Sequence, residues 1–241
     1  MLFNLSNELA NHKLQVILLD CPYDTYRESK FTRDLLSDVF KLKLDGYLAH
    51  YKYGMLPISD FDFMAKHIIL CKNVNEVYYP LAAFKSISNE TCKRFNIDFP
   101  AINHKFGKFK ADFMLFVDAM NTWQTRLEVQ NKVYAYNASW TMQPDIEKNL
   151  RNICREISIA MFYFFYNTEK IEHVINSTSE KYKVNKLQEF MGLKYLNDEA
   201  ENTLSSFRSP AFQQEPFFLM YLDQQGFSAD FVKECQKYKQ L

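Results

Sequence analysis

The feature that most constrains the fold is a helical stripe of apolar residues between two short strand-like segments. The stripe follows Gln143-Pro144-Asp145, where Asp145 is a suitable helix N-cap, and its apolar side chains recur every three or four residues: Ile146, Leu150, Ile153, Ile157, Met161 and Phe164. Before it, Lys132–Met142 is rich in aromatic and β-branched residues, and after it His173–Ser177 is a second short strand. Two strands joined by a helix pair in parallel through a right-handed crossover. The pattern therefore predicts an α/β fold, with these strands as neighbours.

The N-terminal half predicts more strands and helices of the same kind. Leu14–Leu19 is an apolar strand, and the segment from Thr25 to about Tyr51 has a helical pattern, which Asp45-Gly46 should divide into two helices. Lys66–Lys72 and Val77–Ile87 read as antiparallel strands, where Pro80 indicates a bulge or an edge position. A further helical stripe consists of Phe109, Phe113, Phe116, Met120, Trp123 and Leu127.

The C-terminal part continues the alternation. We expect Ser179 to cap a helix that ends at Gly192, because glycine commonly follows the last helical turn. Leu193–Leu196 and Glu215–Leu222 are the last two strands, and Ser228 should cap a final helix reaching about Tyr238. The order of elements excludes an all-helical bundle and a β-sandwich.

The chain reads as a single domain. It has only five glycines and seven prolines in 241 residues, with no repeat and no linker-like segment. We expect one domain over residues 1–241, with residues 223–241 as a C-terminal helical extension.

Composition excludes several classes of function. Lys and Arg balance Asp and Glu at 29 each, so no net charge attracts the chain to nucleic acid. The five cysteines are scattered without metal-ligand spacing, so we expect no metal, and Cys71 and Cys154 read as small buried side chains. The first residues lack the pattern of a signal peptide, and the most apolar stretch, residues 157–166, is about half the length of a membrane span. A cytoplasmic protein without a membrane span is the expectation.

The order of elements resembles the GNAT acyltransferases. The strand at Val133–Met142, the helix that follows, the short strand and the phrase FMGLKYL at 190–196 are similar to the part of the GNAT fold that holds the acyl donor. In the N-terminal half, the loop Ser59-Asp60-Phe61-Asp62 and a strand carrying His67 resemble the acyl-homoserine-lactone synthases and the long-chain N-acyl amino acid synthases. The resemblance implies a mixed central sheet flanked by helices and transfer of an acyl group from a thioester to an amine.

The resemblance also implies which donor is used. GNAT enzymes hold the coenzyme A phosphates on a glycine-containing loop, because backbone N–H groups and the helix N-terminus face the phosphates there. The corresponding segment here, Gln143–Arg151, has no glycine and has two acidic residues. Acyl-carrier protein thus becomes the more natural donor and partner, with an acyl-CoA thioester as the other choice of co-substrate. A small-molecule amine is the acceptor, and no tightly bound cofactor is expected.

Four residues are candidates for the chemistry of amine acylation. By position in the GNAT pattern, Tyr182 is the candidate acid for the leaving sulfur. Asp60 and Asp62 would point the same way in an extended chain and could bind or deprotonate an amine, and Glu128 is a further possible base. The alternatives are a half-buried helix tyrosine, a solvated loop that caps the next element, and a surface carboxylate.

Five residues are candidates for donor binding. Asn137, Ser139 and Thr141 lie where the two parallel strands of a GNAT fold splay, and Lys148 and Arg151 form a basic stripe with Arg155 that could receive a phosphopantetheine or an acidic carrier protein. A solvated helix face, paired in part with Glu147 and Glu156, explains the stripe equally well.

Three other residues and one other function remain open. His67 fits a satisfied core histidine better than a base, and Tyr136 and Trp140 fit either an acyl tunnel or the core. A GNAT-like binding or scaffold protein that has lost the phosphate loop is the alternative to an enzyme, because the fold alone does not establish an activity.

Overall fold

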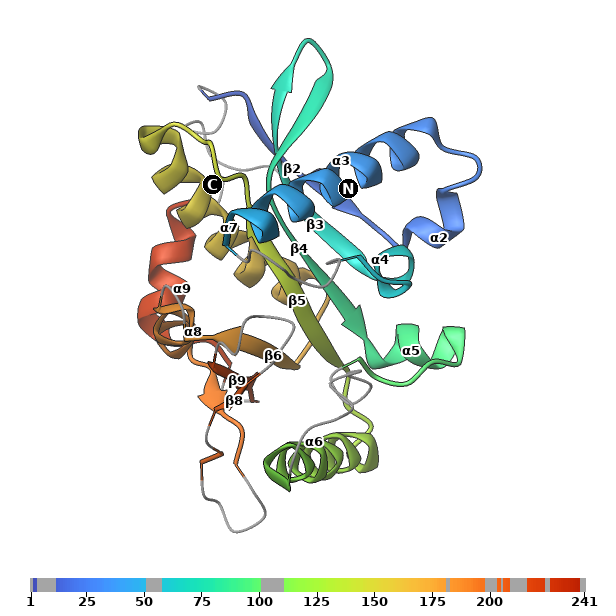
Figure 1. The fold of residues 1–241 in the computed structure, drawn as a ribbon, viewed down its shortest axis with the longest axis vertical. Helices are drawn as coiled ribbons and strands as arrows, with labels where there is room; N and C mark the ends of the chain where they lie inside the picture. Colours follow the sequence, from blue (N-terminus) through green and yellow to red (C-terminus); the bar gives the residue numbers. More distant parts are fainter. Residues whose placement is uncertain are drawn as a thin grey trace. The chain divides into compact units, whose positions relative to one another are not determined.

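The computed structural model in Figure 1 describes residues 2–3, 12–50, 58–100, 111–180, 183–197, 203–204, 206–208, 216–223 and 226–238. The chain divides into two compact units. Unit 1 comprises Met1–Ile87, Ala138–Thr168 and Val232–Leu241, and unit 2 comprises Ser88–Asn137 and Glu169–Phe231. The expectation of a single domain stays a prediction.

Unit 1 contains an antiparallel sheet. Its first four strands, each antiparallel to the next, are β1 (Leu2–Phe3), β2 (Leu14–Leu19), β3 (Lys66–Val74) and β4 (Val77–Ser88). The second half of β5 (Tyr134–Met142) follows β4 in the sheet. The Gln143 N–H donates to the Leu81 carbonyl at 2.8 Å, so the end of β5 lies beside the start of β4. The strands expected at 14–19, 66–72 and 77–87 are confirmed.

Helices cover both faces of this sheet. The described helices of unit 1 are α2 (Pro22–Thr25), α3 (Lys30–His50), α4 (Phe61–Met64) and α7 (Lys148–Thr168). On one face, α3 packs its apolar stripe on strand residues such as Ile17, Ile69 and Ala83. On the other face, Phe84 contacts Phe162 and Phe165 of α7, with ring centroids 5.7 and 6.1 Å apart. Neighbouring residues of β4 therefore face different helices, as the pleat of a strand requires.

The bulge expected near Pro80 is confirmed. Cys71 of β3 is paired with Pro80, whereas the preceding Leu70 is paired with Ala82, so Leu81 is an extra residue on β4. Proline has no N–H to donate to the ladder, and the bulge accommodates this within a strand that has neighbours on both sides.

The predicted break at Asp45-Gly46 is wrong. The helix α3 runs without interruption from Lys30 to His50. Gly46 lies where α3 approaches β5, and a Cβ atom on it would overlap the hydroxyl of Thr141. The glycine therefore serves close helix–strand packing, which outweighs its low helix propensity. Thr141, expected to bind the donor, is buried beneath this helix.

We predict that Gly46→Ala destabilises the protein by about 1–3 kcal/mol, since overpacking costs more than the gain in helix propensity. Thr141→Ala removes the clashing hydroxyl, so the double variant should recover at least about 1 kcal/mol of that loss. Urea unfolding of the four proteins in this cycle measures the coupling. Strictly additive effects would contradict the packing explanation.

Unit 2 contains a mixed sheet. The first half of β5 pairs in parallel with β6 (His173–Ser179), and β6 pairs antiparallel with β9 (Pro216–Leu222). Two short strands, β7 (Lys194–Tyr195) and β8 (Phe207–Arg208), also pair antiparallel with β9. The neighbouring parallel strands predicted on either side of the long helix are thus confirmed. Their ladder has four residue pairs and ends at Asn137–Asn176.

The helices of unit 2 are α5 (Asn89–Phe95), α6 (Ala111–Val129) and α8 (Val184–Met191), while α9 (Ala229–Gln236) begins in unit 2 and ends in unit 1. The expected stripe of α6 is buried through Phe116, Met120, Trp123 and Leu127, and Trp123 packs on Tyr134 of β5. The sequence did not predict α5, although Ser88 caps it by accepting the Thr91 N–H at 3.1 Å.

Two of the expected caps are confirmed and two are wrong. Gly192 ends α8 with φ 105°, and Ser228 accepts the Phe231 N–H at the start of α9. Ser179, however, is the last residue of β6, and α8 begins only at Val184, because pairing with β9 extends the strand to Ser179. Asp145 lies in a turn three residues before α7, so it is not the N-cap.

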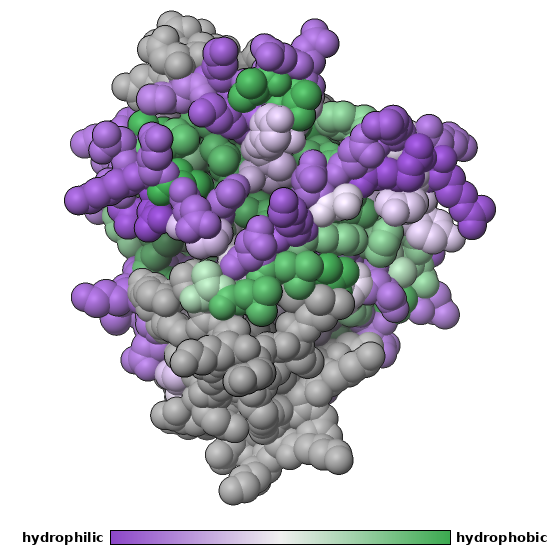
Figure 2. Space-filling model, turned by 45° about the horizontal axis from the view of Figure 1, so that its top comes forward, coloured by the Kyte–Doolittle hydropathy of each residue, from purple (hydrophilic) through white to green (hydrophobic). Residues whose placement is uncertain are grey.

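Hydrophilic residues cover most of the described surface on the face drawn in Figure 2, with hydrophobic patches between them. Large hydrophobic side chains that are exposed in unit 1 include Tyr23, Phe31 and Tyr79. Scattered exposed apolar residues are ordinary for a folded protein. Among the described residues, no helix is long and apolar enough to cross a membrane.

Candidate active site

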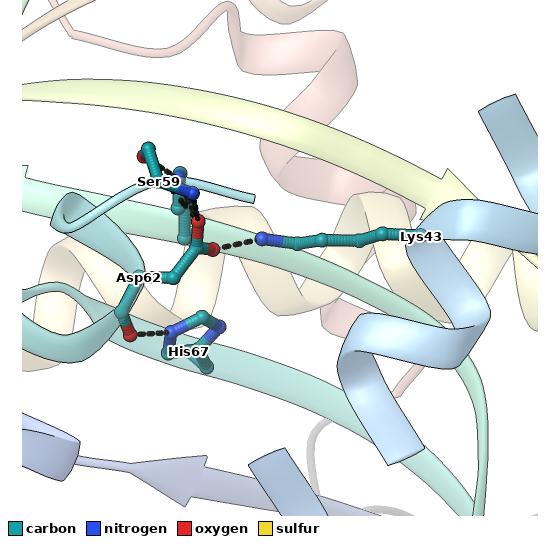
Figure 3. Close-up of polar contacts among 5 residues, drawn as sticks. Lys43, Ser59, Asp62 and His67 are labelled. Carbon is teal, nitrogen blue, oxygen red and sulfur yellow. Dashed lines mark hydrogen bonds and ion pairs between the residues drawn. The ribbon is translucent and has the colours of Figure 1, made fainter. Parts of the chain in front are cut away.

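Unit 1 contains a buried cluster of charged side chains centred on Asp62 (Figure 3). Lys85 of β4 places its Nζ 2.9 Å from Asp62 Oδ2, and Lys43 of α3 forms an ion pair with Oδ1. The Ser59 N–H donates to Oδ2 at 2.8 Å. The side chains of Lys43 and Asp62 are 0% exposed and that of Lys85 is 11% exposed. One carboxylate therefore links α3, α4, β4 and the residues that lead into α4.

His67 lies beside this cluster as a neutral side chain. His67 is on β3, where it is paired with Lys85 of β4. Its Nε2 lies 2.7 Å from the backbone carbonyl oxygen of Asp62. A carbonyl only accepts, so Nε2 carries the proton and Nδ1 does not. Nδ1 is buried and has no hydrogen-bond partner in the described structure. Burial and the charge of Lys43 lower the pKa of His67 to about 3. His67 is a core histidine satisfied at one nitrogen.

The cluster holds one positive charge in excess. Burial by itself raises the pKa of Asp62, but the ammonium groups of Lys43 and Lys85 outweigh it and lower the pKa to about 2. Burial and the charge of Lys85 lower the pKa of Lys43 to about 8. At pH 7 two ammonium groups thus share one carboxylate.

The two aspartates do not form one amine-binding pair. The chain turns into α4 at this point instead of extending, so Asp60 is exposed at the N-cap position whereas Asp62 is buried. Both oxygens of Asp62 already accept hydrogen bonds from lysine side chains. Asp60 is the aspartate that solvent reaches. Lys43 and Lys85 both contact Asp62, but they lie far apart in the sequence, so no local sequence pattern indicates that they meet.

The second half of β5 has an unusual backbone at Ser139. Its φ is 56°, in the left-handed region that a residue with a Cβ rarely adopts, and such strain concentrates at functional sites. The next residue, Trp140, stacks on Phe162 of α7 with an interplanar angle of 10°. Trp140 therefore contributes to the core of unit 1. Tyr136 is buried in unit 2, where its hydroxyl lies 3.0 Å from Ser177 Oγ.

The end of the β5–β6 ladder in unit 2 buries polar groups that have no hydrogen-bond partner among the described residues. These are Oδ1 of Asn137, both amide atoms of Asn176 and Oγ1 of Thr178. The three side chains are 4%, 1% and 2% exposed. Asn137 and Asn176 are register partners and Thr178 lies two residues further, so all three share one face of the sheet. Each unsatisfied group costs about 1–3 kcal/mol, which a ligand that supplies polar atoms would recover.

The other candidates are exposed at the surface or lie outside the described residues. Glu128 is an exposed carboxylate that accepts from the Tyr134 hydroxyl at 2.9 Å and from Gln124, and these hydrogen bonds lower its pKa. Lys148 and Arg151 are exposed on the first turn of α7, and Arg151 donates to the Pro144 carbonyl. Tyr182 lies outside the described residues. In the described part of the chain, no group of three or more acidic, histidine or cysteine side chains could hold a metal ion.

Comparison with proteins of known structure identifies the fold. No protein-family model matches the chain, and no curated protein matches its sequence. Solved structures do match. The alignment with the acyl-homoserine lactone synthase LasI covers 95% of this chain and 96% of LasI, with a TM-score of 0.53 and 9% sequence identity. FeeM, an N-acyl amino acid synthase from uncultured soil microbes, covers 88% of this chain and 92% of its own length, with a TM-score of 0.50 and 10% identity.

A third match extends the series. The CoA-dependent acyl-homoserine lactone synthase MesI covers 92% of this chain and 93% of its own length, with a TM-score of 0.51 and 8% identity. This is the GNAT fold. Because the identities are near 10%, the similarity establishes the fold and not the reaction.

We predict that Asp62→Asn destabilises the protein by about 3–5 kcal/mol, because it leaves two buried ammonium groups without a carboxylate. Asp60→Asn is the matched control, and its exposed position should keep the change within about 0.5 kcal/mol. Urea unfolding at pH 7 compares the two variants. Equal, small effects would contradict a structural role for the buried cluster.

Proposed function

We propose that this protein is an N-acyltransferase that moves an acyl group from a thioester to an amine. The GNAT fold supports this class of reaction. The names of the similar structures point the same way, since one is an N-acyl amino acid synthase and two are acyl-homoserine lactone synthases. The acceptor in this proposal is a small molecule with a primary amine.

The observation that carries the proposal is the set of unpartnered polar groups where the β5–β6 ladder ends. Carboxamides such as those of Asn137 and Asn176 both donate and accept hydrogen bonds, and the Thr178 hydroxyl does the same. An acyl-pantetheine arm carries two amide groups, which donate and accept hydrogen bonds, and a thioester carbonyl, which accepts them. We assign these side chains to binding of the donor arm, because a buried amide without hydrogen-bond partners destabilises the protein unless a ligand provides them.

The chemistry of the step is simple. The amine nitrogen attacks the thioester carbonyl carbon, and the C–N bond forms while the carbonyl oxygen takes negative charge. The C–S bond then breaks, the amine proton passes to a base and the leaving sulfur takes a proton from an acid. We assign stabilisation of the oxyanion to backbone N–H groups of β5 around Ser139, where the left-handed residue redirects the peptide groups. Tyr182 is the proposed acid, and Glu128, which belongs to the same unit as the donor-arm side chains, is the proposed base.

Acyl-carrier protein is the proposed donor. The segment between β5 and α7 has no glycine, and the Arg151 guanidinium binds the Pro144 carbonyl within it. This arrangement suits backbone binding of the coenzyme A pyrophosphate poorly. Exposed Lys148 and Arg151 suit the acidic face of a carrier protein better, since rim charges steer association. Acyl-CoA remains the competing donor.

We predict that Asn176→Leu stabilises the free protein and impairs the reaction. Replacing an unsatisfied buried amide with an apolar group of similar size should raise the free energy of unfolding by about 1–2 kcal/mol. The same change should lower kcat/KM for the acyl donor at least about tenfold. Urea unfolding and steady-state kinetics measure the two effects.

Asn185→Leu is the matched control for this prediction. Asn185 donates to the Tyr195 hydroxyl at 3.1 Å, so its replacement removes a satisfied hydrogen bond and should destabilise the protein. A loss of stability in Asn176→Leu as large as that in Asn185→Leu would contradict the proposed donor site.

The direct test is an acylation assay read by mass spectrometry, with acyl-carrier protein or acyl-CoA as donor and a panel of amino acids and polyamines as acceptors. We expect N-acylated product with the carrier-protein donor, and little stabilisation by millimolar coenzyme A alone. Tyr182→Phe should lower kcat about 10²-fold without weakening donor binding, because only a proton donor is lost. No product with any donor, together with no binding of the acylated carrier protein, would exclude the reaction.

A non-catalytic binding protein is the second candidate, favoured by the glycine-free segment before α7. It predicts that acyl-carrier protein or its acyl-pantetheine arm binds but that no amine is consumed. The same assay separates the two, since binding without product in the presence of every acceptor class supports the binding protein.

A further inference from the structure

The cluster around Asp62 has a charge imbalance that the proposed reaction does not use. The Lys43 ammonium is completely buried, and within the described structure its one hydrogen-bond acceptor is Asp62 Oδ1, although it has three N–H donors. Lys85 contacts Asp62 Oδ2 and Ser59 Oγ. A buried ion pair can repay the cost of desolvation, but a second buried cation on the same carboxylate has no charge of its own to balance it.

Among the described residues, no neighbour supplies the missing negative charge. The described titratable groups that interact with the charge of Lys43 are Asp62 from α4, Lys85 from β4 and His67 from β3. His67 is neutral at pH 7, because burial and the charge of Lys43 lower its pKa to about 3. Cys71 is fully buried in the core between α3 and the sheet, and burial raises the pKa of its thiol to about 12. Within the described part of the chain, loss of a proton is therefore the step that removes the excess charge.

We propose that Lys43 is a proton-sensitive element of unit 1: loss of its proton as pH rises relieves the excess charge and anchors α4 and Ser59 more firmly to the sheet. The remaining Lys85–Asp62 pair is then balanced, and the neutral Lys43 amine still donates to Asp62. Asp60 lies at the start of α4, so the same proton also governs how firmly that exposed carboxylate is held. This inference does not depend on the proposed acyl transfer.

The sign of the effect follows from linkage. Lys43 has a pKa of about 8 in the folded protein, against 10.5 for an ordinary lysine. Between these values the unfolded chain binds more protons than the folded protein, so the contribution of Lys43 to stability rises with pH. The buried thiols act in the opposite direction, because burial raises the pKa of Cys71, Cys92, Cys154 and Cys235. The effect must therefore be measured as a difference from a variant that keeps the cysteines.

Lys43→Met is that variant, since methionine fills similar space without a charge. We expect the unfolding equilibrium constant of the native protein, divided by that of Lys43→Met, to fall about tenfold between pH 7 and pH 9. Urea unfolding at half-unit pH steps gives this ratio. Lys30→Met is the matched control, because Lys30 lies on the same helix with an 82% exposed side chain and an ordinary pair to Asp34. The corresponding ratio of unfolding equilibrium constants for Lys30→Met should not change between pH 7 and pH 9.

A direct titration keeps the proposal testable if Lys43→Met does not fold. The Nζ of Lys43 in the native protein, followed by NMR of ¹⁵N-labelled lysine, should titrate near pH 8, well below the ordinary lysine pKa of 10.5. Lys85→Met should move that titration upward, because it removes the neighbouring charge. A Lys43 titration at pH 10 or above, or a flat ratio for Lys43→Met, would overturn the proposal.

Discussion

The arrangement of unit 1 depends on the ion pairs that the buried Asp62 carboxylate forms with Lys43 and Lys85. A carboxylate removed from water is tolerated only if cations and donors surround it, and here they come from separate parts of the chain. Lys43 of α3 and Lys85 of β4 provide the charge, and the Ser59 N–H provides a further hydrogen bond. The carboxylate thus holds a four-residue helix to a sheet face that also carries a long helix. So short a helix has little stability of its own, which makes the ion pairs its principal anchor.

The polar groups at the end of the β5–β6 ladder illustrate the opposite principle. The carboxylate of Asp62 accepts hydrogen bonds on both oxygens, whereas neither atom of the Asn176 amide has a partner among the described residues. A fold selected for stability alone would replace such an amide with an apolar residue. Buried groups that the protein leaves unpaired are most readily understood as partners of something that binds. The same reasoning applies to Ser139, which holds a left-handed conformation at a cost that a glycine would avoid.

Much of the fold could be predicted from local patterns. The apolar stripe of α7 and the strand segments on either side of it identified the parallel pair β5 and β6, and Pro80 indicated the bulge in β4. Errors arose where a residue had more than one structural use. Gly46 can break a helix or allow close packing, and Ser179 can cap a helix or end a strand, and only the neighbouring β5 and β9 decided between these uses.

The candidate site was less accessible to sequence reasoning. The sequence singled out Asp60, Asp62 and Asn137, but it could not separate an exposed aspartate from a buried one two residues away. The sequence did not predict that Lys43 and Lys85 are buried, because isolated lysines in amphipathic segments ordinarily face solvent. Asn176 and Thr178 were also missed, since an alternating strand does not reveal which of its faces is covered.

The sequence by itself determined the order of helices and strands, the parallel pair and the class of fold, because hydrophobic periodicity depends on residues close along the chain. Only the tertiary structure decided which charges meet and which amides lack partners. Those properties depend on residues far apart in the sequence, such as Lys43, Asp62 and Lys85, and on the burial that sets the energy of each charge and hydrogen bond.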